Sequence, residues 1–144
     1  MRYTQETGTI RFIAEIAPGI YNCLVHAPKI AAAASVGQFV NVLCGGYELR
    51  RPISLCGFDA GLGLLRLVFE VRGKGTRWLS QRQAGEELDL VGPLGHGFPL
   101  MDRNSRAVLV GGGIGTPPLL PLAQRYGSGA TAITGFRSGT AAIL

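Results

Sequence analysis

The first hundred residues alternate between apolar and polar positions in short runs. Ile10, Phe12 and Ile16 alternate with Arg11 and Glu15. A period of two places successive side chains on opposite faces of a strand. Similar alternating or wholly apolar runs occupy residues 21–25, 37–44, 51–58, 65–71 and 87–91. Because glycine and proline separate these runs, we expect a six-stranded antiparallel barrel.

One helical segment interrupts the predicted barrel. Thr76 is a residue type that caps helices, and Trp78 and Leu79 follow it before Gly85. This pattern predicts a short helix between the last two strands. The last strand is expected to end at Gly92-Pro93.

The pattern changes after the polar residues 102–105. Residues 107–110 are wholly apolar, as in a parallel strand covered on both faces. A glycine-rich turn, a helix over residues 119–125 and a second strand over residues 130–136 follow. The order predicts one β-α-β unit, with Pro117 and Pro118 at the helix start.

The chain is therefore expected to divide into a barrel over residues 1–101 and an α/β unit over residues 106–144. The strands of a single β-α-β unit need further partners, and one helix covers one face of the sheet. We expect the second unit to be an incomplete domain. The chain is then a fragment, or it docks on something that completes the sheet.

Composition narrows the classes of function. Of the 144 residues, 47% are hydrophobic, which excludes a largely disordered chain. The net charge is +5, but the basic residues form no run, so we expect no nucleic acid partner. The N-terminus has no apolar signal segment. Glycines and prolines break the uncharged residues 107–124, so we expect no membrane span.

The three cysteines are far apart in the sequence. Cys23, Cys44 and Cys56 form no C-x-x-C pair, so we expect neither a zinc site nor an iron–sulfur cluster, and no metal. Each lies in an apolar strand-like segment. Buried free thiols of this kind fit a reducing cytoplasm.

Three segments carry candidate chemistry, and the first is Arg51-Pro52-Ile53-Ser54. Alternation along the strand turns Arg51 and Ile53 to one face and Pro52 and Ser54 to the other. The Arg guanidinium suits a diphosphate, and the Ser hydroxyl or backbone N–H suits a ring edge. The alternative is a strand that begins with a solvated Arg.

The second segment is Gly73-Lys74-Gly75-Thr76, directly before the predicted helix. Free N–H groups at a helix start attract phosphate, and glycines allow close approach. The alternative is a glycine-rich hairpin turn.

The third segment, residues 111–118, joins an apolar strand to a helix. It departs from G-x-G-x-x-G because position 116 is Thr, but its context suits a nucleotide phosphate. The alternative is tight strand–helix packing without a ligand. No catalytic triad, carboxylate pair or metal-ligand cluster is present in the sequence pattern, so we assign no catalytic residue.

Taken together, the three segments and Gly92-Pro93-Leu94-Gly95 resemble the motifs of the ferredoxin reductase superfamily. The residues within these motifs are most similar to those of the electron transfer subunits of dihydroorotate dehydrogenase B. The resemblance covers nearly the whole chain. It implies an FAD-binding barrel, an NAD-binding domain and a dihydroorotate dehydrogenase catalytic subunit as partner in pyrimidine biosynthesis. It also implies an oxidoreductase component in which FAD exchanges electrons with NAD and with a 2Fe–2S cluster.

The resemblance further implies the site residues. FAD would be lined by Arg51, Pro52, Ile53, Ser54, Val68, Phe69 and Glu70, with its diphosphate at Gly75 and Thr76. NAD would face residues 112–118, including Gly112, Gly113, Gly115, Thr116 and Pro118. The cysteines of the family's cluster are absent here, so we expect a C-terminally truncated member that needs the missing region and a partner subunit.

Two other functions remain open from the sequence. One is a related flavoprotein subunit of a ferredoxin:NADP or sulfide oxidoreductase. The other is a truncated, non-catalytic flavin-binding module. Arg137-Ser138, just past the last predicted strand, lies where a ribose is expected and leaves NAD and NADP both open.

Overall fold

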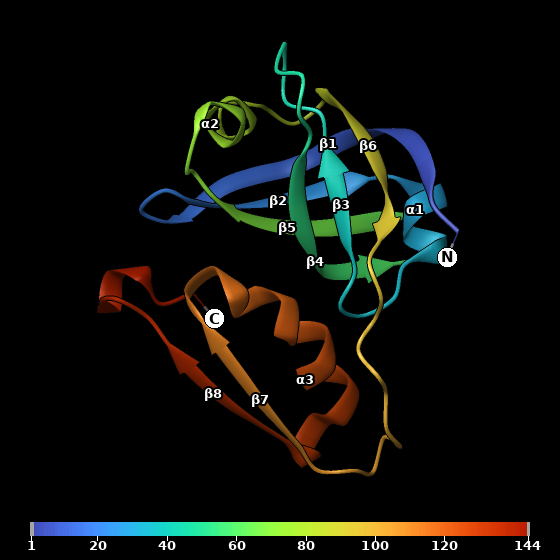
Figure 1. Ribbon diagram of the computed structural model, residues 1–144, viewed down its shortest axis with the longest axis vertical. Coiled ribbons are helices and arrows are strands. Elements are labelled where there is room, and N and C mark those ends of the chain that lie inside the picture. Colours follow the sequence, from blue (N-terminus) through green and yellow to red (C-terminus); the bar gives the residue numbers. More distant parts are fainter. Residues whose placement is uncertain (1, 144) are drawn as a thin grey trace.

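The computed structural model describes residues 2–143 and shows a closed barrel beside a smaller α/β unit (Figure 1). The barrel strands are β1 (Thr4–Ala17), β2 (Ile20–His26), β3 (Phe39–Val42), β4 (Arg51–Asp59), β5 (Leu64–Glu70) and β6 (Glu87–Leu94). Their order is β1-β2-β5-β4-β3-β6, and β6 closes on β1. Every pair is antiparallel, which confirms the predicted barrel.

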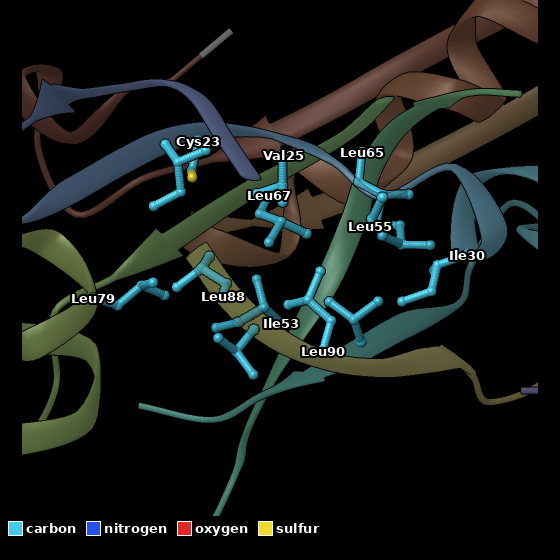
Figure 2. Packing of buried hydrophobic residues seen from close by; sticks show 14 of the residues in the cluster. Cys23, Val25, Ile30, Ile53, Leu55, Leu65, Leu67, Leu79, Leu88 and Leu90 are labelled. Atoms are coloured by element: carbon cyan, nitrogen blue, oxygen red, sulfur yellow. The ribbon is translucent and has the colours of Figure 1, made fainter. Parts of the chain in front are cut away.

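The barrel interior is filled by the inward side chains of all six strands. Figure 2 shows this packing, with Cys23 and Val25 of β2 facing residues from β4, β5 and β6. Leu55, Leu65, Leu67, Leu88 and Leu90 are each at most 1% exposed. Burial of apolar surface on this scale is the main stabilising contribution to such a barrel.

Two short helices lie beside the barrel. Helix α2 (Lys74–Ser80) fills the predicted position but begins before Thr76, with Gly73 as its N-cap. Helix α1 (Pro28–Ala33) was not predicted. Strand β6 also differs, because it continues through Gly92-Pro93 to Leu94 while Gly92 pairs with Thr4. Among residues 2–143, no helix has the length and apolarity needed to span a bilayer.

The smaller unit has the predicted β-α-β order. Strands β7 (Ala107–Gly112) and β8 (Ala130–Gly135) are parallel, and α3 (Leu120–Tyr126) lies between them in the chain. Short 3-10 turns occupy Gly113–Gly115, Pro117–Leu119, Gly127–Gly129 and Gly139–Ala141. Leu109 packs with Leu122 and Tyr126 of α3.

The strand over residues 107–110 was expected to be covered on both faces of the sheet. The face opposite α3 is instead exposed. Val108 and Val110 are 67% and 71% exposed, and Ile133 of β8 is 55% exposed. Within residues 2–143, burial is therefore confined to the α3 face of β7, since residues 131–135 of β8 are exposed on both faces.

An apolar cluster joins the two units. Ala17, Ile20, Cys56 and Val68 come from the barrel, and Ile114, Phe136 and Ile143 come from the smaller unit. We call this cluster the barrel–sheet contact. It brings the glycine turn after β7 against strand β5.

Candidate functional site

Two open hollows lie along the barrel–sheet contact. The smaller hollow, about 240 Å³, is lined by Pro52, Ile53, Ser54, Val68, Phe69, Glu70, Arg72, Thr76 and Ile114. The larger hollow, about 500 Å³, is lined by Ile20, Glu70, Arg72, Gly112, Gly113, Ile114, Gly135, Phe136, Arg137 and Ala141. Glu70, Arg72 and Ile114 line both, so the two hollows adjoin.

Strand β4 forms one wall of the smaller hollow. Ile53 is buried, whereas Pro52 and Ser54 on either side are exposed, as the alternation predicts. All three line the hollow. The strand thus presents a fixed, mostly apolar edge with one hydroxyl.

Arg51 sits apart from these three residues, against the start of α2. Its Nη1 donates to the Leu49 carbonyl at 2.9 Å. A Cβ on Gly75 would lie 2.7 Å from Arg51 Nε, so the glycine permits this packing. Arg51 and Gly75 therefore lie together, but neither lines one of these two hollows.

Thr76 fixes the turn that leads into α2. Its hydroxyl oxygen accepts hydrogen bonds from the backbone N–H groups of Arg72 at 2.9 Å and Gly73 at 3.2 Å. The side chain also reaches the smaller hollow. The role as an N-cap expected from the sequence was wrong by three positions, because the hydroxyl reaches back from inside the helix.

Strand β5 forms the other wall. Val68 and Phe69 are 6% and 2% exposed, and the Phe69 ring stacks on Tyr21 with centroids 5.7 Å apart. Glu70 ends the strand, and its Oε2 accepts from Arg72 Nη2 at 2.6 Å and from Arg72 Nε at 3.0 Å. A rigid apolar wall thus ends in an ion pair at the point where the hollows adjoin.

The glycine turn after β7 lines the larger hollow through Gly112 and Gly113. A Cβ added at either position would meet no protein atom within 4 Å, so packing does not require these glycines to lack one. Gly113 does have a φ of +52°, which favours glycine. Gly111 differs, since its Cβ would lie 2.8 Å from Leu119 Cδ1.

The rest of the predicted turn lies away from both hollows. Gly115, Thr116 and Pro118 line neither hollow. Thr116 is 1% exposed, and its hydroxyl has no hydrogen-bond partner among residues 2–143. The third segment therefore contributes Gly112, Gly113 and Ile114 to the site, whereas Thr116 is packed inside the protein.

Several lining residues were not assigned as site residues from the sequence. Arg72 and Ile114 stand inside the quoted segments, so their position was a usable signal. Ile20, Phe136 and Ala141 had no local signal, since only the packing of two distant units brings them to the larger hollow.

The cysteines remain outside this chemistry. Burial raises the pKa of Cys23 to about 12 and of Cys56 to about 11, and it also raises the pKa of Cys44. All three are therefore neutral thiols at pH 7. Among residues 2–143, no group of three His, Cys, Asp or Glu side chains is placed to hold a metal ion.

The closed barrel followed by the β-α-β unit has the fold of ferredoxin reductase-like proteins. An NADH-dependent reduced ferredoxin–NADP oxidoreductase has a TM-score of 0.85 and 30% identity, over 95% of this chain and 51% of that one. Phthalate dioxygenase reductase has the same fold, with a TM-score of 0.77 and 20% identity over 95% of this chain and 45% of the other.

Within that class, the chain is homologous to the electron transfer subunits of dihydroorotate dehydrogenase B (NAD(+)), which confirms the resemblance seen in the motifs. It is 42% identical to the Bacillus mycoides (strain KBAB4) subunit over 116 residues, 77% of this chain and 45% of the relative. It is 40% identical to the Geobacillus thermodenitrificans (strain NG80-2) subunit over 134 residues, which are 88% of this chain and 52% of that relative. The chain thus spans about half the length of these relatives. No family model matches the chain.

Proposed function

We propose that the chain binds FAD in the smaller hollow and receives a pyridine nucleotide in the larger one. The observation that carries this proposal is the sharing of Glu70, Arg72 and Ile114 by both hollows. Shared lining residues place the two hollows next to each other, and direct transfer requires two ligands that are held close together. FAD, when bound, supplies the exchange of a hydride for single electrons.

The described residues fit a flavin. The smaller hollow offers an apolar wall at Val68 and Phe69 and a polar edge at Ser54, so a largely apolar ring with polar edges suits it. We assign Arg51, Gly75 and Thr76 to the diphosphate, because they meet at the start of α2. Arg51 supplies the positive charge there.

The open glycines fit a nucleotide in the larger hollow. Gly112, Gly113 and Gly135 all line it, and a Cβ on any of them would project into free space. A ligand backbone or phosphate can thus approach the main chain closely. In this proposal, residues 1–101 are the flavin-binding domain, and residues 106–144 are an incomplete NAD-binding domain.

The biological role follows from the relatives. Their names describe electron transfer subunits of a dihydroorotate dehydrogenase that uses NAD(+). We assign this chain the same role in the cytoplasm, with a dihydroorotate dehydrogenase catalytic subunit as partner in pyrimidine biosynthesis. The three cysteines are buried and apart, so they do not fit a 2Fe–2S cluster, and we route no step through one.

A second candidate is supported by one observation. The 30% identity to an NADH-dependent ferredoxin–NADP oxidoreductase makes a ferredoxin-linked role the alternative. Affinity purification from the native cell discriminates, because a dihydroorotate-oxidising partner supports the first role and a ferredoxin-linked complex supports the second.

The test of the function is a visible absorption spectrum of the purified chain with the released cofactor identified. We expect a flavin band from FAD. The double variant Arg51→Ala, Thr76→Ala removes a charged partner and a hydrogen-bonding hydroxyl. It should weaken FAD binding by about tenfold to a hundredfold, since such partners contribute about 1.5–3 kcal/mol to binding. A colourless chain that takes up no added FAD, or unchanged FAD affinity in the double variant, contradicts the proposal.

A further inference from the structure

We propose that Arg72 is a switching residue, held by Glu70 and transferred to a phosphate of the pyridine nucleotide when that ligand enters. In this arrangement Arg137 holds the nucleotide from the opposite side. The inference rests on the proposed nucleotide site and adds to it the residues that control affinity.

The first observation is the position of Arg72. It follows β5 and lines both hollows, and its side chain is 66% exposed. Among residues 2–143, Glu70 Oε2 is the one group that holds its guanidinium, through Nε at 3.0 Å and Nη2 at 2.6 Å. A long, exposed side chain with one charged partner is free to turn toward a second partner.

The second observation is Arg137 on the far wall. It follows β8, is exposed, and lines the larger hollow beside Gly135 and Phe136. Arg137 makes no ion pair within residues 2–143. Two guanidinium groups thus face one hollow from different units, and Glu70 is the only acidic residue in its lining.

The balance of interactions favours the transfer. An exposed ion pair such as Glu70–Arg72 contributes little, because water screens it. A diphosphate carries more negative charge than one carboxylate and accepts the guanidinium fork in a bidentate manner. Glu70 also repels an incoming phosphate. The carboxylate therefore competes with the ligand for Arg72.

This competition predicts effects of opposite sign. Arg72→Gln and Arg137→Gln should each weaken NADH binding by about fivefold to twentyfold, as expected for loss of one charge-assisted contact. Glu70→Gln keeps the shape of the side chain but removes its charge and releases Arg72, so it should tighten NADH binding by about threefold. A purely structural ion pair would give no gain in Glu70→Gln.

The experiment is an NADH fluorescence titration of the purified chain, both as isolated and after loading with FAD. Arg11→Gln is the matched control, because Arg11 is exposed on β1 and lines neither hollow. Inorganic diphosphate should displace NADH from the unmodified chain and have less effect on the Arg72→Gln, Arg137→Gln double variant. Thermal melts of each variant check that the fold is intact.

The two proposals separate cleanly in this design. FAD content and flavin reduction test the function, whereas the signs of the NADH shifts test the switch. Weaker or unchanged NADH binding in Glu70→Gln overturns the inference. So does an unmodified chain that binds FAD but not NADH, or an equal loss in Arg11→Gln.

Discussion

The Arg51–Gly75 pair ties a charged side chain to a helix start. The guanidinium stem occupies the space that a Cβ on Gly75 would take, with 2.7 Å to Arg51 Nε. Glycine at this position therefore sets where Arg51 lies, and with it the positive charge that we assign to the diphosphate.

We expect Gly75→Ala to weaken FAD binding about tenfold, because the new methyl displaces Arg51 from its charge-assisted contact. The thermal midpoint should change little, since alanine favours the helix by about 1 kcal/mol and offsets part of the overpacking. Flavin titration and thermal melts measure both quantities. In the Arg51→Ala background, Gly75→Ala should cause no further loss of FAD affinity. Additive losses of affinity would show that Gly75 does not act through Arg51.

Cys23 gives the barrel a pH dependence. Burial raises its pKa from 9.0 to about 12, so the folded chain keeps the thiol proton more tightly than the unfolded chain does. The stabilisation is complete below pH 9 and is lost as the pH rises toward 12. Cys23 should contribute a loss on the order of 2 kcal/mol to urea unfolding between pH 8 and pH 10.5. Cys56, whose pKa burial raises to about 11, loses stability over the same window. Cys23→Ala should therefore reduce the slope without abolishing it, and an unchanged slope would assign it to other groups.

Strand β7 has one face turned to α3 and one face open to solvent. Leu109 is 7% exposed, whereas its neighbour Val108 is 67% exposed. Because consecutive residues of one strand point to opposite faces, these two residues allow a direct comparison of the faces.

We expect Leu109→Ala to lower the free energy of unfolding by about 2–5 kcal/mol, because it leaves a cavity against α3. Val108→Thr should stay within about 0.5 kcal/mol, since that side chain already contacts solvent. Urea denaturation of both variants measures the difference. A large cost for Val108→Thr would mean that another segment or chain covers the open face in solution.

The elements that the sequence could and could not indicate differ in the range of their interactions. The six barrel strands carried an alternating or wholly apolar pattern within their own residues, bounded by glycine and proline, so local pattern sufficed. Helix α1 could not be predicted from local sequence, because the backbone N–H groups of Lys29 and Ile30 are capped by the Glu6 carboxylate of β1. No local pattern contains that contact.

The same reason explains the site. Pro52 to Ser54, Val68 to Glu70 and Thr76 were predicted from motifs, and the structure brings them to one hollow. Ile20 and Phe136 reach the larger hollow only through the barrel–sheet contact, which joins residues more than a hundred positions apart. The ligand assignments themselves remain predictions.

At the scale of the whole molecule, the barrel–sheet contact fixes the position of the two hollows relative to each other. Phe136→Ala should loosen it, because the ring packs against that cluster. We expect faster hydrogen exchange in β7 and β8 and unchanged exchange in β2 and β5. Uniform acceleration in both units would instead indicate that the chain unfolds as a single cooperative unit.

Closure of the barrel by β1 and β6 also has a consequence for biosynthesis. Thr4 pairs with Gly92, so the first strand finds one of its two neighbours only after most of the barrel sequence has been made. High contact order of this kind slows folding, and an unpaired strand edge invites association with other nascent chains. The β1 edge is therefore the part of the emerging polypeptide that most needs protection by a chaperone until β6 has left the ribosome.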